Sequence, residues 1–318
     1  MITLFDLPHA DAKAIVSKGA PVYLGVNPVE YHGPHLSLHN DRLVSRGLAE
    51  RMHGLLSMSE WPMIWAEDIE MGVEPVPGPG TRAASFPMLR SALLDACHGL
   101  AELGAQRVII CTFHGSPLHN LAIEEALESL RARGIKAIAP LHILLEALIE
   151  PPPGLLERFA PAVAQVSDPA LRKSLLDDLP LDFHAGFFET SVALALAPAS
   201  VSPLYRDLPP CPPVVPKAGA LASARALKMA GRYRLAKELE FIAAGLGWYA
   251  VRPFPGYTSR PSLASAEAGQ VFVDAIVRMY AEAARAVLID GAPAPKPPMP
   301  WIRWATLGGR VKAGLEVE

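Results

Sequence analysis

One short segment, residues 30–41, constrains this chain more than any other. It reads EYHGPHLSLHND and concentrates side chains that commonly bind metals: Glu30, His32, His35, His39 and Asp41. The preceding residues 21–26 (PVYLGV) are apolar and β-branched, which predicts a buried strand. Apolar residues in 43–55 then recur at helical spacing. The segment is therefore a strand-to-helix connection, and open α/β sheets place their sites in such loops.

The ligand types in this segment predict a particular chemistry. Carboxylate oxygen and imidazole nitrogen together suit Zn, Mn, Fe or Co. Residues two apart on an extended chain point the same way, about 6–7 Å apart, so Glu30 and His32 could hold neighbouring metals. Asp41 could return to that pocket and bridge them. The alternative is a polar loop with solvated histidines, in which Asn40 or Asp41 caps the helix; the segment by itself leaves both interpretations open.

Length and composition exclude several classes of protein. A chain of 318 residues that is 51% hydrophobic can bury one large core or two smaller ones. The net charge of −3 indicates no nucleic-acid partner and no anionic membrane surface. Three scattered cysteines fit reduced thiols. No signal peptide and no apolar run of about 18 residues is recognisable, so we expect a cytoplasmic protein.

Strand and helix patterns alternate along most of the chain. They predict a three-layer α/β/α sandwich with a mostly parallel central sheet, covered by helices on both sides. Residues 71–81 contain too much Gly and Pro for regular structure and form either a crossover loop or a substrate-contacting loop. We expect strands at 21–26, 61–69, 107–112 and 136–141, and helices at 9–18, 41–55, 86–103, 117–133 and 263–288.

Two stretches, 144–180 and 199–250, interrupt this alternation. Both are proline-rich at the start, and the second continues into a single predicted helix, Leu221–Leu246. A row of basic residues on that helix favours a solvated face over an anion site. Long inserts beside a site often act as lids or subunit contacts. In the C-terminal tail, 289–318, the WIRW motif either docks onto a neighbouring chain or packs within its own.

Four stretches in a fixed order resemble the creatininase (creatinine amidohydrolase) family. A fainter similarity lies at 256–269, and the resemblance covers most of 1–143 and 182–288. The four stretches are EYHGPHLSL (30–38) with Asp41, PGPGT (77–81), VIICTFHGSPLHN (108–120) and HAGFFETS (184–191).

The resemblance implies one hydrolase domain over 1–288 that holds two divalent ions, Zn, Mn or Fe. One metal would be held by Glu30, Asp41 and His114. The second would be held by His32, Asp41 and Glu189. His184 resembles the family histidine that transfers protons to the leaving nitrogen, a task suited to imidazole. The resemblance also implies a homo-oligomer, with a hexamer favoured. We expect the remaining histidines of these motifs, His35, His39 and His119, to form hydrogen bonds that orient the ligands or stabilise the fold.

The chain departs from creatininase at two places. Creatininase binds metal through a glutamate at the position of Ser116, so Glu189 must serve here instead. Creatininase also closes its pocket with tryptophans before the HAG motif, whereas this chain has no Trp between Trp65 and Trp248. The nearest aromatic residues are Phe183, Phe187 and Phe188. Creatinine is therefore not the expected substrate.

Three functions remain as hypotheses. The first is a di-metal amidohydrolase that cleaves a non-peptide C–N bond of a small-molecule amide (a cyclic amide, lactam or formamide) by attack of metal-bound hydroxide. The second is a small peptidase that trims a peptide-derived precursor. The third is a non-catalytic metal-binding assembly protein, against which the complete ligand set and His184 both argue.

Overall fold

The computed structural model describes residues 1–56 and 61–311, and its centre is a parallel sheet. Within these residues the strand order is β1-β3-β2-β4-β5, and every neighbouring pair is parallel. The predicted sheet is confirmed, although β5 is shorter than expected because Leu141 already begins a helix. The strands are β1 (Ile2–Thr3), β2 (Val22–Val26), β3 (Ile64–Ile69), β4 (Arg107–Cys111) and β5 (Lys136–Ile138).

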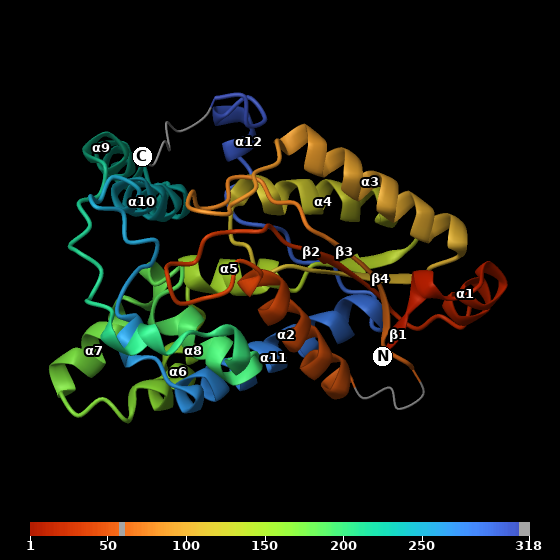
Figure 1. The fold of residues 1–318 in the computed structure, drawn as a ribbon. Helices are drawn as coiled ribbons and strands as arrows, with labels where there is room; N and C mark the ends of the chain where they lie inside the picture. Colours follow the sequence, from red (N-terminus) through yellow and green to blue (C-terminus); the bar gives the residue numbers. More distant parts are fainter. Residues whose placement is uncertain (57–60, 312–318) are drawn as a thin grey trace.

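Helices cover both faces of this sheet, which gives the three layers expected (Figure 1). Alternate residues of β2 enter different cores: Val22 and Leu24 pack on one side and Tyr23 on the other. The first core is formed with α1 (His9–Val16), α3 (Phe86–Leu103) and α4 (Pro117–Arg131). The second is formed with α2 (Asn40–Leu56), α5 (Leu141–Ile149), α6 (Leu155–Phe159), α8 (Phe187–Leu196) and α11 (Ala266–Leu288).

The contact between α8 and α11 is unusually close at Gly269. A Cβ atom on this glycine would lie 1.8 Å from the carbonyl oxygen of Ser191, so only hydrogen fits there. Helix α11 begins at Ser265, whose hydroxyl accepts a hydrogen bond from the Ala268 N–H. The first turn of α8 carries Glu189, so this contact fixes the position of that carboxylate.

The two inserts form helices at the end of the molecule away from α1 (Figure 1). The prediction of a single helix at Leu221–Leu246 is wrong. This segment forms two helices, because Gly231 adopts a left-handed conformation (φ 73°) that ends the first one. Three residues of the basic row form ion pairs, Lys228 with Glu240, Arg234 with Glu146 and Lys237 with Glu150, as expected for a solvated face. The insert helices are α7 (Pro169–Asp177), α9 (Ala218–Met229) and α10 (Tyr233–Trp248), in addition to α5 and α6.

The C-terminal tail packs back onto its own chain. The indole N–H of Trp301 donates to Oε2 of Glu238 on α10 at 2.6 Å, and Ile302 is buried. Trp304, in α12 (Ile302–Ala305), remains 77% exposed. Intrachain packing therefore accounts for one tryptophan of WIRW but not for the other. Short 3-10 turns lie at Leu4–Asp6, Ala160–Val163, Leu179–Leu181, Pro198–Ser200, Pro203–Asp207 and Pro261–Leu263.

Candidate metal centre

The carboxyl ends of β2 and β4 bring the predicted ligands together. The two strands are neighbours in the sheet, so the segments that follow them emerge at one edge. Asp41 reaches this edge from the first turn of α2, and Glu189 from the first turn of α8. All six predicted site residues are at most 6% exposed: Glu30, His32, Asp41, His114, His184 and Glu189.

His114 forms one half of the cluster. Its Nδ1 lies 2.9 Å from Oε2 of Glu30 and 3.7 Å from Oδ2 of Asp41. Its Nε2 lies 2.9 Å from the carbonyl oxygen of Val73. A carbonyl only accepts, so Nε2 carries the hydrogen and Nδ1 turns its lone pair toward the carboxylates.

His32 forms the other half in the same manner. Its Nδ1–H donates to the carbonyl of Glu30 at 3.1 Å, which leaves Nε2 facing the acids. Nε2 lies 3.1 Å from Oδ1 of Asp41 and 3.4 Å from Oε1 of Glu189. Asn40 orients Glu189 through a 2.8 Å hydrogen bond to the same Oε1. The two oxygens of Asp41 therefore face two different imidazoles.

This arrangement fits cations. In the tautomers that the backbone carbonyls select, lone pairs of His32 and His114 oppose carboxylate oxygens, which is unfavourable unless a proton or a metal lies between them. Oε2 of Glu30 and Oδ2 of Asp41 accept no hydrogen bond from any described residue. Burial is the largest single effect and lowers the pKa of His114, but the charge and hydrogen bonding of Glu30, the charge of Asp41 and the carbonyl of Val73 together outweigh it and raise the pKa to about 9. Asp41 and Glu189 likewise raise the pKa of His32 well above its usual range despite burial.

His184 lies on the second half of the cluster. Its ring stacks on His32 with centroids 4.3 Å apart, and its Nε2–H donates to the carbonyl of Tyr31 at 2.9 Å. Burial first, and then the charge of His32, lower the pKa of His184 to about 3. At this pKa the ring is neutral at neutral pH, and because Nε2 carries its hydrogen, Nδ1 keeps a lone pair that can accept a hydrogen bond. His184 can also act as a ligand, since ligand atoms of His32, His184 and Glu189 all lie within 4.8 Å of one another.

The other histidines of the motifs lie outside this cluster. His35 contacts the hydroxyl of Thr190 on α8 at 2.8 Å. His119 lies edge-on against His114, with centroids 4.9 Å apart. His39 lies 3.5 Å from Glu70 in a partly exposed ion-pair group. None of the three belongs to the groups of described residues that could hold a metal.

Sequence reasoning missed an aromatic residue and a buried acid at this site. The ring of Trp248, from α10, lies 5.5 Å from His184, closer to the chemistry than Phe187, which packs in the core. Asp182 accepts hydrogen bonds from the Phe188 N–H and from the hydroxyl of Thr258. Asp182 could have been suspected from its place just before the HAG motif. Nothing local signals Trp248, because it belongs to an insert.

A cavity of about 330 Å³ opens onto the cluster. It exposes Glu30, His114, His184 and Glu189, and its walls are largely apolar. This volume lies within the range of small-ligand pockets.

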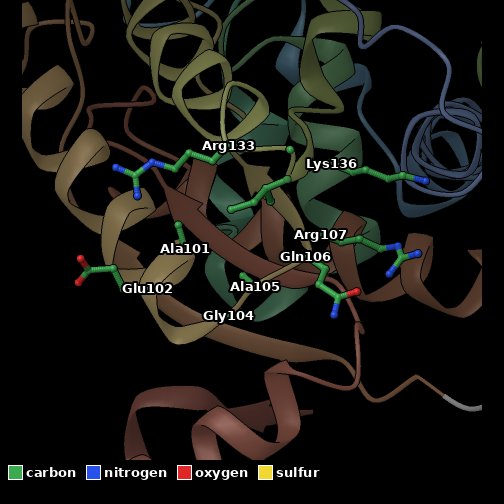
Figure 2. A pocket seen from close by; sticks show the side chains of 10 residues that line it. Ala101, Glu102, Gly104, Ala105, Gln106, Arg107, Arg133 and Lys136 are labelled. Carbon is green, nitrogen blue, oxygen red and sulfur yellow. The ribbon is translucent and has the colours of Figure 1, made fainter.

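A larger hollow, about 490 Å³, lies at the amino ends of β4 and β5 but is not organised as a site. Figure 2 shows the side chains of Arg133 and Lys136 directed away from each other. Arg107 donates to the carbonyls of Leu288 and Gly19, and Lys136 to that of Ile289. Arg107 and Lys136 therefore bind backbone carbonyls of other segments of the chain.

A parallel α/β/α sandwich with buried Glu, Asp and His side chains at the carboxyl edge of its sheet defines a metal-dependent hydrolase fold. The chain belongs to the creatininase family (creatinine amidohydrolase), whose pattern it matches over residues 6–284. In the described part of the chain, no helix has the length and apolar character needed to cross a membrane.

Known proteins with similarity to this chain include a curated sequence and solved structures. The mycofactocin precursor peptide peptidase of Mycobacterium ulcerans is 29% identical over 137 residues, which is 41% of this chain and 54% of that protein. The match thus spans about half the length of that relative. A crystal structure of creatinine amidohydrolase (creatininase) has a TM-score of 0.57 at 20% identity, covering 91% of this chain and 98% of that one. A structure described as "Creatininase Mn" has a TM-score of 0.54 at 20% identity, covering 91% and 99%.

Proposed function

We propose that this protein is a di-metal amidohydrolase that cleaves a non-peptide C–N bond of a small-molecule amide. The observation that carries the proposal is the placement of Asp41. Its Oδ1 lies 3.1 Å from Nε2 of His32, and its Oδ2 lies 3.7 Å from Nδ1 of His114. A carboxylate that faces two ligand nitrogens in this way is suited to bridge two ions.

The remaining ligands divide between the two halves of the cluster. Glu30 and His114 accompany Asp41 in one half, and His32 and Glu189 in the other. Oxygen and nitrogen ligands of this kind suit Zn, Mn or Fe. Two such ions would polarise a carbonyl group and lower the pKa of a water molecule.

The protein's own side chains orient the ligands and move protons. The carbonyls of Val73 and Glu30 fix the tautomers of His114 and His32, so both ligand nitrogens are preorganised. His184 takes a proton at Nδ1 and delivers it to the leaving nitrogen. Its Nε2–H bond to Tyr31 holds the ring in place for this transfer.

A peptide bond is the second candidate target. The similarity to a mycofactocin precursor peptide peptidase and the largely apolar cavity favour it. Because the matched segment spans about half of that relative, its activity is not transferred to this chain. Both candidates use the same ligand set.

The test combines metal analysis with an activity screen. Protein loaded with Zn, Mn or Fe is assayed against cyclic amides, formamides and dipeptides, with released amine as the readout. We expect close to two metals per chain and turnover in one of these three substrate groups. Loaded protein that turns over none of them would support the non-catalytic alternative.

A further inference from the structure

The loop 71–81 is attached to the metal cluster at two points. The carbonyl of Val73 holds the ring of His114, and the N–H of Val76 donates to Oε1 of Glu30 at 2.6 Å. Glu74 lies between these two attachments and has a left-handed backbone conformation (φ 54°), which is uncommon for a non-glycine residue. Strained conformations of this kind persist where surrounding contacts enforce them, often at functional sites. The loop thus directs a third carboxylate toward the cavity.

A hydrogen bond from Ser116 holds the side chain of Glu74 at the cavity. The hydroxyl of Ser116 donates to Oε2 of Glu74 at 3.0 Å, and both residues line the cavity beside His114. Among the described residues nothing donates to Oε1 of Glu74, so this oxygen can accept a hydrogen bond from a ligand. A short serine at position 116 leaves room for a carboxylate that comes from another segment.

The rest of the cavity wall is apolar and comes from the inserts and the tail. Helix α5 contributes leucines, α10 contributes Phe241 and Ile242, and the tail contributes Trp301 and Ile302. No lysine or arginine is found among the described residues that line this cavity. A bulky apolar group would be desolvated against this wall, whereas an anionic group there would have no cationic side chain as a partner.

We propose that the site selects amides that carry a bulky apolar group together with an N–H or ammonium donor, with the apolar group against α5 and α10 and the donor on Glu74. This inference rests on the proposed function for the location of the reacting carbonyl. The selection itself is a property of the cavity and is measured by binding, independently of turnover.

The experiment compares three ligands on the metal-loaded protein by calorimetry. Phenylalaninamide has both features, 3-phenylpropanamide lacks the ammonium group, and glycinamide lacks the phenyl ring. We expect phenylalaninamide to bind roughly 10- to 100-fold more tightly than glycinamide because of the buried ring. We expect it to bind roughly 10-fold more tightly than 3-phenylpropanamide because of a charge-assisted hydrogen bond. Equal affinities within either pair would overturn the corresponding half of the proposal.

Two variants separate the contributions. Glu74→Gln retains the acceptor for Ser116 but removes the charge. It should therefore weaken the binding of phenylalaninamide roughly 10-fold and leave the binding of 3-phenylpropanamide unchanged. If the amine instead lost its proton and bound the metals through its lone pair, its binding would be unaffected by this substitution, which would refute the role of Glu74. Ile242→Thr should weaken the binding of both phenyl compounds and leave the binding of glycinamide unchanged. An equal loss of affinity for all three ligands would refute the apolar subsite. Glu67→Gln, at an exposed position of β3, is the matched charge control.

Turnover on the same samples tests the proposed function separately. If binding follows the expected order and no amide or dipeptide is hydrolysed, the cavity assignment stands and the catalytic proposal fails. If amides are hydrolysed without preference for the phenyl compounds, the catalytic proposal stands and the selection fails.

Discussion

Nδ1 of His114 lies 2.9 Å from Oε2 of Glu30, and neither atom carries a hydrogen in the tautomer that Val73 selects. Without metal, the pair requires an added proton, and the pKa of His114 rises to about 9 accordingly. A cation removes the need for that proton. In the proposed assignment, in which His114 is a metal ligand, metal binding and protonation compete at this residue.

Metal loading should release protons. At pH 7.5 we expect about one proton from His114 per first metal bound, since its pKa of about 9 lies above that pH. Calorimetry in buffers with different ionisation enthalpies measures the number of protons released per metal bound. No proton release would show that His114 is neutral in the metal-free protein.

The stability of the metal-free protein should fall at alkaline pH. The pKa of His114 is raised on folding from 6.5 to about 9, so the folded state holds the extra proton between these values. Its contribution is complete below pH 6.5 and is lost as the pH rises through 9. Thermal unfolding in a chelator from pH 6 to pH 9.5 tests this, with metal-loaded protein as the control. A flat profile would contradict it.

His184 and Glu189 should respond differently to alanine. In the proposed assignment, His184→Ala keeps both metals and loses roughly 10²–10⁴-fold in kcat. Glu189→Ala drops the metal content toward one per chain and regains activity partly at high metal concentration. The metal stoichiometry and the turnover of both variants are measured. Loss of a metal from His184→Ala would instead make His184 a ligand of the second ion.

The buried Asp182 should make the stability of the protein depend on pH in a lower pH range than His114 does. Burial raises the pKa of its carboxyl to about 7, so the folded state keeps it protonated where the unfolded chain ionises it. Stability is therefore lost as the pH rises from about 4 to about 7, by roughly 1.4 kcal/mol per pH unit. Asp182→Asn should flatten this part of the profile in urea titrations of metal-loaded protein. An unchanged profile would place the pKa of Asp182 near its ordinary value.

The close contact at Gly269 should couple packing to metal affinity. Gly269→Ala drives a methyl group against the carbonyl of Ser191, which should cost on the order of 2 kcal/mol and displace α8. Because α8 carries Glu189, metal affinity should fall as well. Gly99→Ala is the matched control: it lies in the interior of α3, has no atom within 4 Å of the new methyl group, and should stabilise by up to about 1 kcal/mol. Equal stability of the two variants would contradict the coupling.

Assembly into a homo-oligomer, with a hexamer favoured, remains a prediction. The insert helices expose apolar side chains that a monomer would leave in water, such as Met229 and Tyr233. Light scattering on the full chain measures the molar mass. A monodisperse monomer would refute the prediction, and Met229→Glu should weaken an assembly that uses this surface.

Local sequence patterns were sufficient to predict the layers of the fold, and the stretches that resemble the creatininase family predicted the members of the cluster. The apolar run of β2 and the helical spacing in α3 and α11 are short-range signals, and both are retained in the structure. The ligand types follow strand ends, and the ends of neighbouring parallel strands meet at one edge. Helix boundaries were less secure: apolar spacing continues through Gly231, yet its left-handed backbone divides α9 from α10.

Only the tertiary structure decided how these residues act together. Which nitrogen of His114 faces Glu30 depends on the carbonyl of Val73, which lies 41 residues away in the chain. The carboxylate of Glu74 reaches Ser116 because its loop is attached to Glu30 and His114 of the cluster. Trp248 reaches His184 because an insert folds over the cavity. The sequence determined the residue types and their order through local periodicity. Packing between distant segments determined which atoms face one another, since no local propensity encodes those contacts.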